Sequence, residues 1–245
     1  MHPTYDEAAA QPQPLSKEEV TAQIKSRVAR IDREFLSAFE FITSFPRSVT
    51  FFGSARFKEG SKHYIQARRL AGKIVKELGY TVLTGGSSGI MEAANRGAFE
   101  AKGESVGLNI RLPREQGGNK YTTASLDFAH FFVRKVALSY AAEAYIFFPG
   151  GFGTLDEFFE IITLVQTHKI RRVPIFLVGK DYWEPLNRFI KENILEIHQA
   201  ISKHDMELYK VTDNGDEIIE AIKNVPVHDG ILRKKSKPEP EAVAS

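Results

Sequence analysis

The residues best suited to chemistry lie in one stretch, residues 144–160, which reads AYIFFPGGFGTLDEFFE. An apolar run predicts a buried strand, a glycine-rich turn follows, and from Thr154 the sequence has the period of an amphipathic helix. Glycines let a backbone approach a ligand closely, and the first N–H groups of a helix lack internal partners, so this arrangement can bind a phosphate. The alternative is a ligand-free turn in which Thr154 and Glu157 form a capping box.

The same stretch resembles a family signature. The run P-G-G-x-G-T-x-x-E, from Pro149 to Glu157, resembles the signature of the LOG (Lonely Guy) family. An Arg-Lys pair that opens the preceding helix in this family matches Arg134 and Lys135, and the resemblance extends over about residues 46–225. Members of the family are cytokinin riboside 5′-monophosphate phosphoribohydrolases, often mislabelled as lysine decarboxylases.

The resemblance implies roles for individual residues. It implies that Arg134 and Glu157 are catalytic. The substrate-binding residues that it implies are Gly53, Ser54, Gly86, Met91, Glu115, Lys135, Gly150, Gly151, Phe152, Gly153, Thr154, Asp156 and Thr163. Two of these positions also fit a simpler interpretation, because Arg134 can be an ordinary surface arginine and Glu115 a solvated loop glutamate.

Two more glycine turns precede the signature. Gly53 and Ser54 follow an apolar run at 49–52, and the sequence GGSSG at 85–89 follows another at 80–83. The second turn departs from the G-G-G-P-G of related sequences through Ser87 and Ser88. Each turn alone also fits a plain strand-to-helix connection, but parallel strands bring such turns together at the carboxyl edge of the sheet. We therefore expect the three turns to converge there.

Strands and helices alternate along the chain, which predicts an α/β fold: a Rossmann-like, doubly wound parallel sheet with helices on both faces. The predicted strands are 49–52, 80–83, 104–110, 128–133, 145–148, 173–178 and a short segment ending at Val211. Arg134 is expected to open a helix directly after the fourth strand. We expect one nucleotide-binding domain over residues 15–225, between disordered tails at 1–14 and 226–245.

A long helix is predicted at 16–44, at the start of this domain. Ser16 and Glu19 form a capping box, and apolar residues then recur at steps of three and four from Val20 to Ile42. Such a stripe must be buried against another surface, which is either the sheet of the same chain or another subunit. Because LOG relatives are dimers or larger assemblies, the resemblance implies a homo-oligomer.

Composition excludes several functions. The net charge of +2 provides no global field for nucleic acid, and no apolar run approaches the ~20 residues of a membrane span. The absence of cysteine excludes disulfides, thiolate zinc sites and cysteine nucleophiles. The first residues lack the pattern of a signal peptide, and together these features suit a cytoplasmic protein without membrane or nucleic-acid partners.

The sequence also predicts neither a metal nor a cofactor. No two of the seven histidines have metal-ligand spacing, and nothing indicates the lysine and pocket of a pyridoxal phosphate enzyme. The expected activity is hydrolysis of the N-glycosidic bond of a nucleoside 5′-monophosphate, a cytokinin ribotide or AMP, to the free base and ribose 5-phosphate. The alternatives are a non-catalytic carrier of a nucleotide or molybdenum cofactor and a structural oligomer with a vestigial site.

Overall fold

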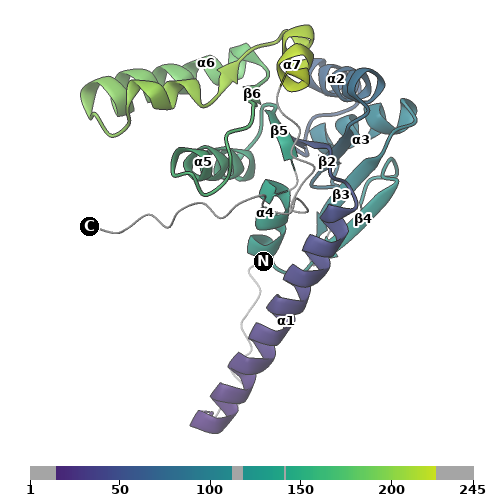
Figure 1. Cartoon of the computed structure of the whole chain (residues 1–245), viewed down its shortest axis with the longest axis vertical. Helices are drawn as coiled ribbons and strands as arrows, with labels where there is room; N and C mark the ends of the chain where they lie inside the picture. Colours follow the sequence, from purple (N-terminus) through teal and green to yellow (C-terminus); the bar gives the residue numbers. More distant parts are fainter. Residues whose placement is uncertain (1–14, 112–117, 141, 225–245) are drawn as a thin grey trace, which may run out of the picture.

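The computed structural model describes residues 15–111, 118–140 and 142–224. In these residues seven strands form one parallel sheet in the order β4-β3-β2-β1-β5-β6-β7 (Figure 1). The strands are β1 Ser48–Phe52, β2 Thr81–Thr84, β3 Ser105–Ile110, β4 Ala124–Phe128, β5 Ala142–Phe147, β6 Ile175–Leu177 and β7 Lys210–Val211. The predicted doubly wound α/β fold is confirmed.

Helices cover both faces of the sheet because the central strands are apolar on both sides. One core lies under α1 Lys17–Thr43, α4 Phe131–Tyr140, α5 Phe152–Gln166 and α6 Lys180–Phe189. The other lies under α2 Lys62–Leu78, α3 Ile90–Glu100 and α7 Gly215–Lys223. A π-helix, η1 Ile190–Ile197, continues α6, and a short 3-10 helix, η2 Lys203–Glu207, precedes β7.

The strand order reverses at the centre of the sheet. The chain builds β1 to β4 in one direction and then returns to place β5 on the other side of β1. Ligands of open α/β sheets bind outside the carboxyl ends of the strands at such a switch point. The turns that follow β1 and β5 both lie there, so the fold brings two of the predicted glycine turns to the same place.

The long N-terminal helix divides into two parts. The predicted capping box of Ser16 and Glu19 is present at its start. Ala38 and Ile42, near its end, belong to the core of the domain. Its first half projects away from the sheet (Figure 1) and all of residues 17–30 are exposed. The apolar stripe of this helix is therefore buried in the core near its end and exposed in its first half.

The prediction of a strand at 128–133 was wrong. The fourth strand ends at Phe128, and α4 begins at Phe131, so Arg134 is the fourth residue of this helix instead of its first. A short apolar run fits a strand and a buried helix equally well, and periodicity does not separate the two. In the structure Phe131–Val133 form the first residues of α4.

Several expectations fall on other parts of the chain. Both predicted tails and Glu115 lie outside the described residues. Over the described ranges, no helix combines the length and the apolar character needed to cross a bilayer.

Candidate active site

The three glycine turns meet at the carboxyl edge of the sheet through backbone hydrogen bonds. The Ser54 N–H donates to the Pro149 carbonyl at 3.0 Å, which joins the turn after β1 to the signature turn. The Ile90 N–H donates to the Ser54 carbonyl, also at 3.0 Å, and so joins the turn after β2. The expected convergence is therefore confirmed, with the turn after β1 between the other two.

Glycine is required in the turn after β2 for conformational reasons. Gly86 and Gly89 have φ values of 72° and 67°, in the left-handed region that side chains disfavour. A β-carbon at Gly89 would also collide with the backbone of Ser54 and Ala55. The close approach of the two turns therefore depends on the absence of a side chain at this position.

A side chain from beyond β3 holds this turn in place. Asn119 was not among the site residues predicted from the sequence. In the structure its Nδ2 donates to the Gly86 and Ser87 carbonyls at 3.2 Å each. It also donates to Oδ1 of Asn95, which is fully buried, at 2.9 Å. Because a buried amide needs hydrogen-bond partners, the burial of Asn95 in α3 accounts for this contact.

The signature turn leaves an open helix N-terminus. Helix α5 begins at Phe152 with Gly151 as its N-cap and no side-chain capping bond, so the capping-box interpretation of Thr154 and Glu157 was wrong. A β-carbon at Gly151 or Gly153 would meet no atom within 4 Å. One at Gly150 would collide with the buried Thr154 side chain. Gly150 is thus needed for packing, whereas free space lies beside the other two glycines.

Phe152 and Tyr182 flank this turn in different ways. The Tyr182 hydroxyl donates to the Gly150 carbonyl at 2.7 Å and holds the turn against α6. Phe152 is 94% exposed, which is unusual for a large apolar side chain. It lies at the first position of α5, beside the signature turn, where a ligand or another molecule can cover it.

Arg134 is buried at the same edge, which excludes its interpretation as a surface arginine. Its Nε donates to the Leu108 carbonyl at 2.6 Å and its Nη2 to the Gly85 carbonyl at 3.1 Å. These carbonyls belong to the end of β3 and to the turn after β2. The permanent guanidinium charge is therefore held in one orientation beside the glycine turns.

Glu157 lies in the second turn of α5, and burial raises the pKa of its carboxyl to about 7. The charges of Arg134 and Lys135 oppose this rise, and those of Asp156 and Glu160 support it. Solvent still reaches part of the residue. No hydrogen bond or ion pair engages its carboxylate within the described part of the chain, so the group is available to a ligand and can exchange a proton near neutral pH.

Lys135 links the two helices that carry Arg134 and Glu157. Its Nζ lies 2.8 Å from Asp156 Oδ2 and 3.1 Å from Glu160 Oε2, so it joins α4 to α5. Burial lowers the pKa of Lys135, but the hydrogen bonds to the two carboxylates outweigh it and raise the pKa overall. Lys135 and Asp156 thus engage each other across the two helices.

The remaining predicted residues have different surroundings. Met91 is half-buried beside Gly85. The Ser54 hydroxyl accepts a hydrogen bond from the Arg56 N–H at 3.1 Å, within its own turn. Thr163 lies further along α5, exposed, with its hydroxyl bonded to the Phe159 carbonyl at 2.6 Å. A group of metal-ligating side chains was not found among the residues that the structure describes.

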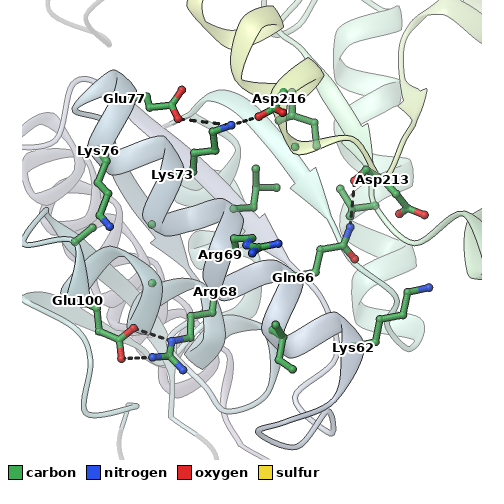
Figure 2. A pocket seen from close by; sticks show the side chains of 18 residues that line it. Lys62, Gln66, Arg68, Arg69, Lys73, Lys76, Glu77, Glu100, Asp213 and Asp216 are labelled. Atoms are coloured by element: carbon green, nitrogen blue, oxygen red, sulfur yellow. Dashed lines mark hydrogen bonds and ion pairs between the residues drawn. The ribbon is translucent and has the colours of Figure 1, made fainter.

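A second concave region lies away from this edge. It is an open groove of about 1050 Å³ over α2, between α3 and α7 (Figure 2). Several of its charges pair with one another: Arg68 holds Glu100 through two bonds of 2.7 Å, and Lys73 lies between Glu77 and Asp216. No residue of the three glycine turns lines it. The chemistry of the side chains favours the glycine edge over this groove as the candidate active site.

The fold and this edge define a Rossmann-like α/β protein with an open helix N-terminus at its switch point. A family model described as possible lysine decarboxylase matches residues 91–222, more than half of the chain. The chain belongs to this family, the LOG family. The sequence resemblance is thereby confirmed.

Curated relatives carry the name phosphoribohydrolase. The probable cytokinin riboside 5′-monophosphate phosphoribohydrolase LOGL5 of Oryza sativa subsp. japonica is 33% identical over 156 residues, which are 62% of each chain. The match thus spans less than two thirds of that relative. Cytokinin riboside 5′-monophosphate phosphoribohydrolase LOG5 of Arabidopsis thaliana is 28% identical over 78% of this chain and 83% of its own length.

Solved structures share the fold. The structural-genomics target TM1055 is 20% identical with a TM-score of 0.55, over 73% of this chain and 99% of its own. A molybdenum cofactor carrier protein from Chlamydomonas reinhardtii is 23% identical with a TM-score of 0.52, over 72% of this chain and 94% of its own. Likeness at these identities concerns the fold alone.

Proposed function

We propose that this protein hydrolyses the N-glycosidic bond of a nucleoside 5′-monophosphate, AMP or a cytokinin ribotide, to the free base and ribose 5-phosphate. The observation that carries the proposal is the Glu157 carboxyl, with its pKa raised to about 7, close to the buried Arg134 and to an open helix N-terminus. The names of the curated relatives support the same reaction.

In the proposed complex the 5′-phosphate lies at the start of α5. The N–H groups of the first turn have no capping side chain, and a β-carbon at Gly151 or Gly153 would point into open space. Such N–H groups and the helix dipole favour an anion. The neighbouring turn, with Gly53 and Ser54, and the turn with Gly86 and Met91 then line the ribose and the base.

The proposed chemistry centres on Glu157. When the bond between C1′ and the base nitrogen breaks, its electrons leave with the base, and positive charge develops on the ribose, by analogy with glycosides. A carboxylate beside the sugar stabilises this charge and accepts a proton from the water that adds to C1′. A group with a pKa near neutral pH can take up that proton and pass it to the nitrogen of the departing base, which leaves as the neutral free base.

Arg134 complements this role as a fixed cation. It keeps part of the Glu157 population ionised, because its charge lowers the pKa that burial raises. It also offers a permanent positive group to the phosphate or to the departing base. Lys135, Asp156, Phe152, Thr163 and Glu115 complete the set of substrate-binding residues that we propose from the family pattern.

The direct experiment is incubation of the protein with AMP and measurement of free adenine and ribose 5-phosphate. We expect turnover by the wild-type protein and a loss of about 10²–10⁴ in kcat for Glu157→Gln. Glu196→Gln, an exposed glutamate of η1, is the matched control and should keep wild-type turnover. Binding of AMP without release of adenine would instead favour a nucleotide carrier.

Adenosine provides the test of the phosphate site. It lacks the group that the α5 N-terminus is proposed to bind, and each charge-assisted hydrogen bond contributes roughly 1.5–3 kcal/mol. Two such bonds correspond to about two to four orders of magnitude in kcat/KM. Equal turnover of adenosine and AMP would contradict this part of the proposal.

We also propose that the protein is a homo-oligomer, a dimer or larger. Val20, Ile24 and Val28 on the projecting half of α1 are 41%, 57% and 58% exposed. Phe131, Phe132 and other aromatic residues of α4 and α5 add to the exposed apolar surface. Exposed apolar surface of this extent is typical of a protein–protein interface.

A further inference from the structure

The N-terminal helix contacts the start of the helix that carries Arg134. Glu34 of α1 accepts hydrogen bonds from the backbone N–H groups of Ala129 and His130, the second at 3.2 Å. The same carboxylate lies 2.6 Å from Nδ1 of His130. The residues in contact are 95 and 96 positions apart, and Glu34 lies outside the segment matched by the family model.

These contacts place the Glu34 carboxylate at the N-terminus of α4, on the N–H groups of the two residues that precede the helix. The N–H groups at the start of a helix have no intrahelical acceptors, and a carboxylate there also interacts favourably with the helix dipole. The Arg134 N–H donates to the His130 carbonyl at 3.2 Å, which forms the first turn of the helix. His130, whose N–H donates to the Glu34 carboxylate, therefore also accepts the backbone hydrogen bond from Arg134 that helps to place it.

We propose that Glu34 is a positioning residue for Arg134, and that the N-terminal helix is thereby part of the catalytic apparatus. Glu34 acts through the backbone of Ala129 and His130 and does not itself reach the reacting atoms. This inference rests on the proposed function for its kinetic consequence. The position of the guanidinium can be tested separately from any activity.

The docking of α1 does not depend on Glu34, because other contacts hold α1 against α4. The rings of Phe35 and Phe132 lie 6.2 Å apart between centroids, and those of Phe39 and Tyr140 lie 5.5 Å apart in an edge-on arrangement. Ala38 and Ile42 are buried in the core. Loss of the Glu34 carboxylate should thus leave α1 docked and disturb the start of α4.

The experiment compares Glu34→Ala with Glu40→Ala. Glu40 is exposed on the same helix, its side chain makes no hydrogen bond or ion pair within the described ranges, and its replacement changes the net charge equally. For Glu34→Ala we expect kcat with AMP to fall by on the order of 10–100-fold, because small displacements of catalytic groups cost this much. The control should keep wild-type kcat.

A spectroscopic measurement separates positioning from a general loss of structure. The Nε–H resonance of Arg134, assigned by its absence in Arg134→Lys, reports the hydrogen bond to the Leu108 carbonyl. We expect Glu34→Ala to shift or broaden this resonance while core amide resonances and those of the Glu40→Ala control stay unchanged. If wild-type protein does not hydrolyse AMP, the proposed function fails, and this resonance still decides the positioning role.

Glu34→Gln covers the case in which the alanine variant does not fold. The amide oxygen of glutamine can accept one of the two backbone hydrogen bonds but carries no charge. We expect a smaller change than for alanine, in the same direction, in both kcat and the Arg134 resonance. Wild-type kcat together with an unchanged Arg134 resonance in the Glu34 variants would overturn the proposal.

Discussion

Burial raises the pKa of Glu157 to about 7 because water no longer solvates the carboxylate fully. The ordinary value is 4.5, so between pH 4.5 and about 7 the folded chain retains a proton that the unfolded chain has released. Stability therefore falls as the pH rises through this window and stays reduced above it. A residue suited to proton transfer is here placed at a cost to the fold.

Glu157→Gln should stabilise the protein at alkaline pH. Glutamine is neutral at every pH, so the variant avoids the cost of burying a charge, which we put at about 1–3 kcal/mol after allowing for partial exposure. Urea unfolding should show the variant to be more stable than wild type at pH 8 and equal to it at pH 4. A variant that is less stable at pH 8 would indicate a structural role for Glu157.

Lys135→Met should move the pH dependence of turnover. The positive charge of Lys135 lowers the pKa of Glu157, whereas the negative charges of Asp156 and Glu160 raise it. Lys135 forms ion pairs with both of these carboxylates. Removal of Lys135 therefore raises the pKa of Glu157 further. If the carboxylate is the active form, the rising limb of kcat against pH should move to higher pH.

Lys135→Arg is the matched control for this shift, since it keeps the positive charge between α4 and α5. Its pH profile should stay close to that of the wild-type protein. An unshifted limb in Lys135→Met would mean that a group other than Glu157 controls the profile.

At the scale of elements, two adjacent glycines of the signature turn differ in role. Gly150 is needed for packing, whereas Gly151 lies beside the space that we propose for the phosphate. Gly150→Ala should destabilise the protein by about 1–3 kcal/mol, because the new methyl group collides with the Thr154 side chain. Gly151→Ala should leave stability almost unchanged, since its φ of −92° suits alanine and the methyl group meets no protein atom.

Substitution of Gly151 should affect AMP binding although it leaves stability almost unchanged. If the phosphate of AMP occupies the open space beside this glycine, Gly151→Ala should weaken AMP binding in a protein of normal melting temperature. Calorimetric titration with AMP and thermal unfolding test both statements together. Normal AMP affinity in Gly151→Ala would place the phosphate elsewhere.

At the scale of the whole molecule, the projecting half of α1 should determine association. Ile24→Glu combined with Val28→Glu places two charges on the exposed apolar stripe and should shift the protein toward monomer. Ala22→Glu places a charge outside this stripe and is the control. Sedimentation velocity at micromolar concentration gives the outcome, and a wild-type monomer would contradict the proposed oligomer.

The sequence by itself determined the fold class and the convergence of the three glycine turns. Alternating apolar segments predicted the doubly wound sheet, and glycines after three strands predicted turns that meet at its carboxyl edge. These features depend on residues close together in the chain. Periodicity and turn chemistry report such local preferences directly. The signature from Pro149 to Glu157 also identified the family.

Only the tertiary structure decided what depends on distant residues. The residues before α4 bond to Glu34, some 95 residues away, a contact that no local pattern reports, and the local pattern misplaced the start of α4 and with it Arg134. Asn119 joins the turn after β2 from beyond β3. The raised pKa of Glu157 arises from burial and from charges on a neighbouring helix. Burial and electrostatic fields are properties of the assembled molecule, and no local pattern in the sequence encodes them.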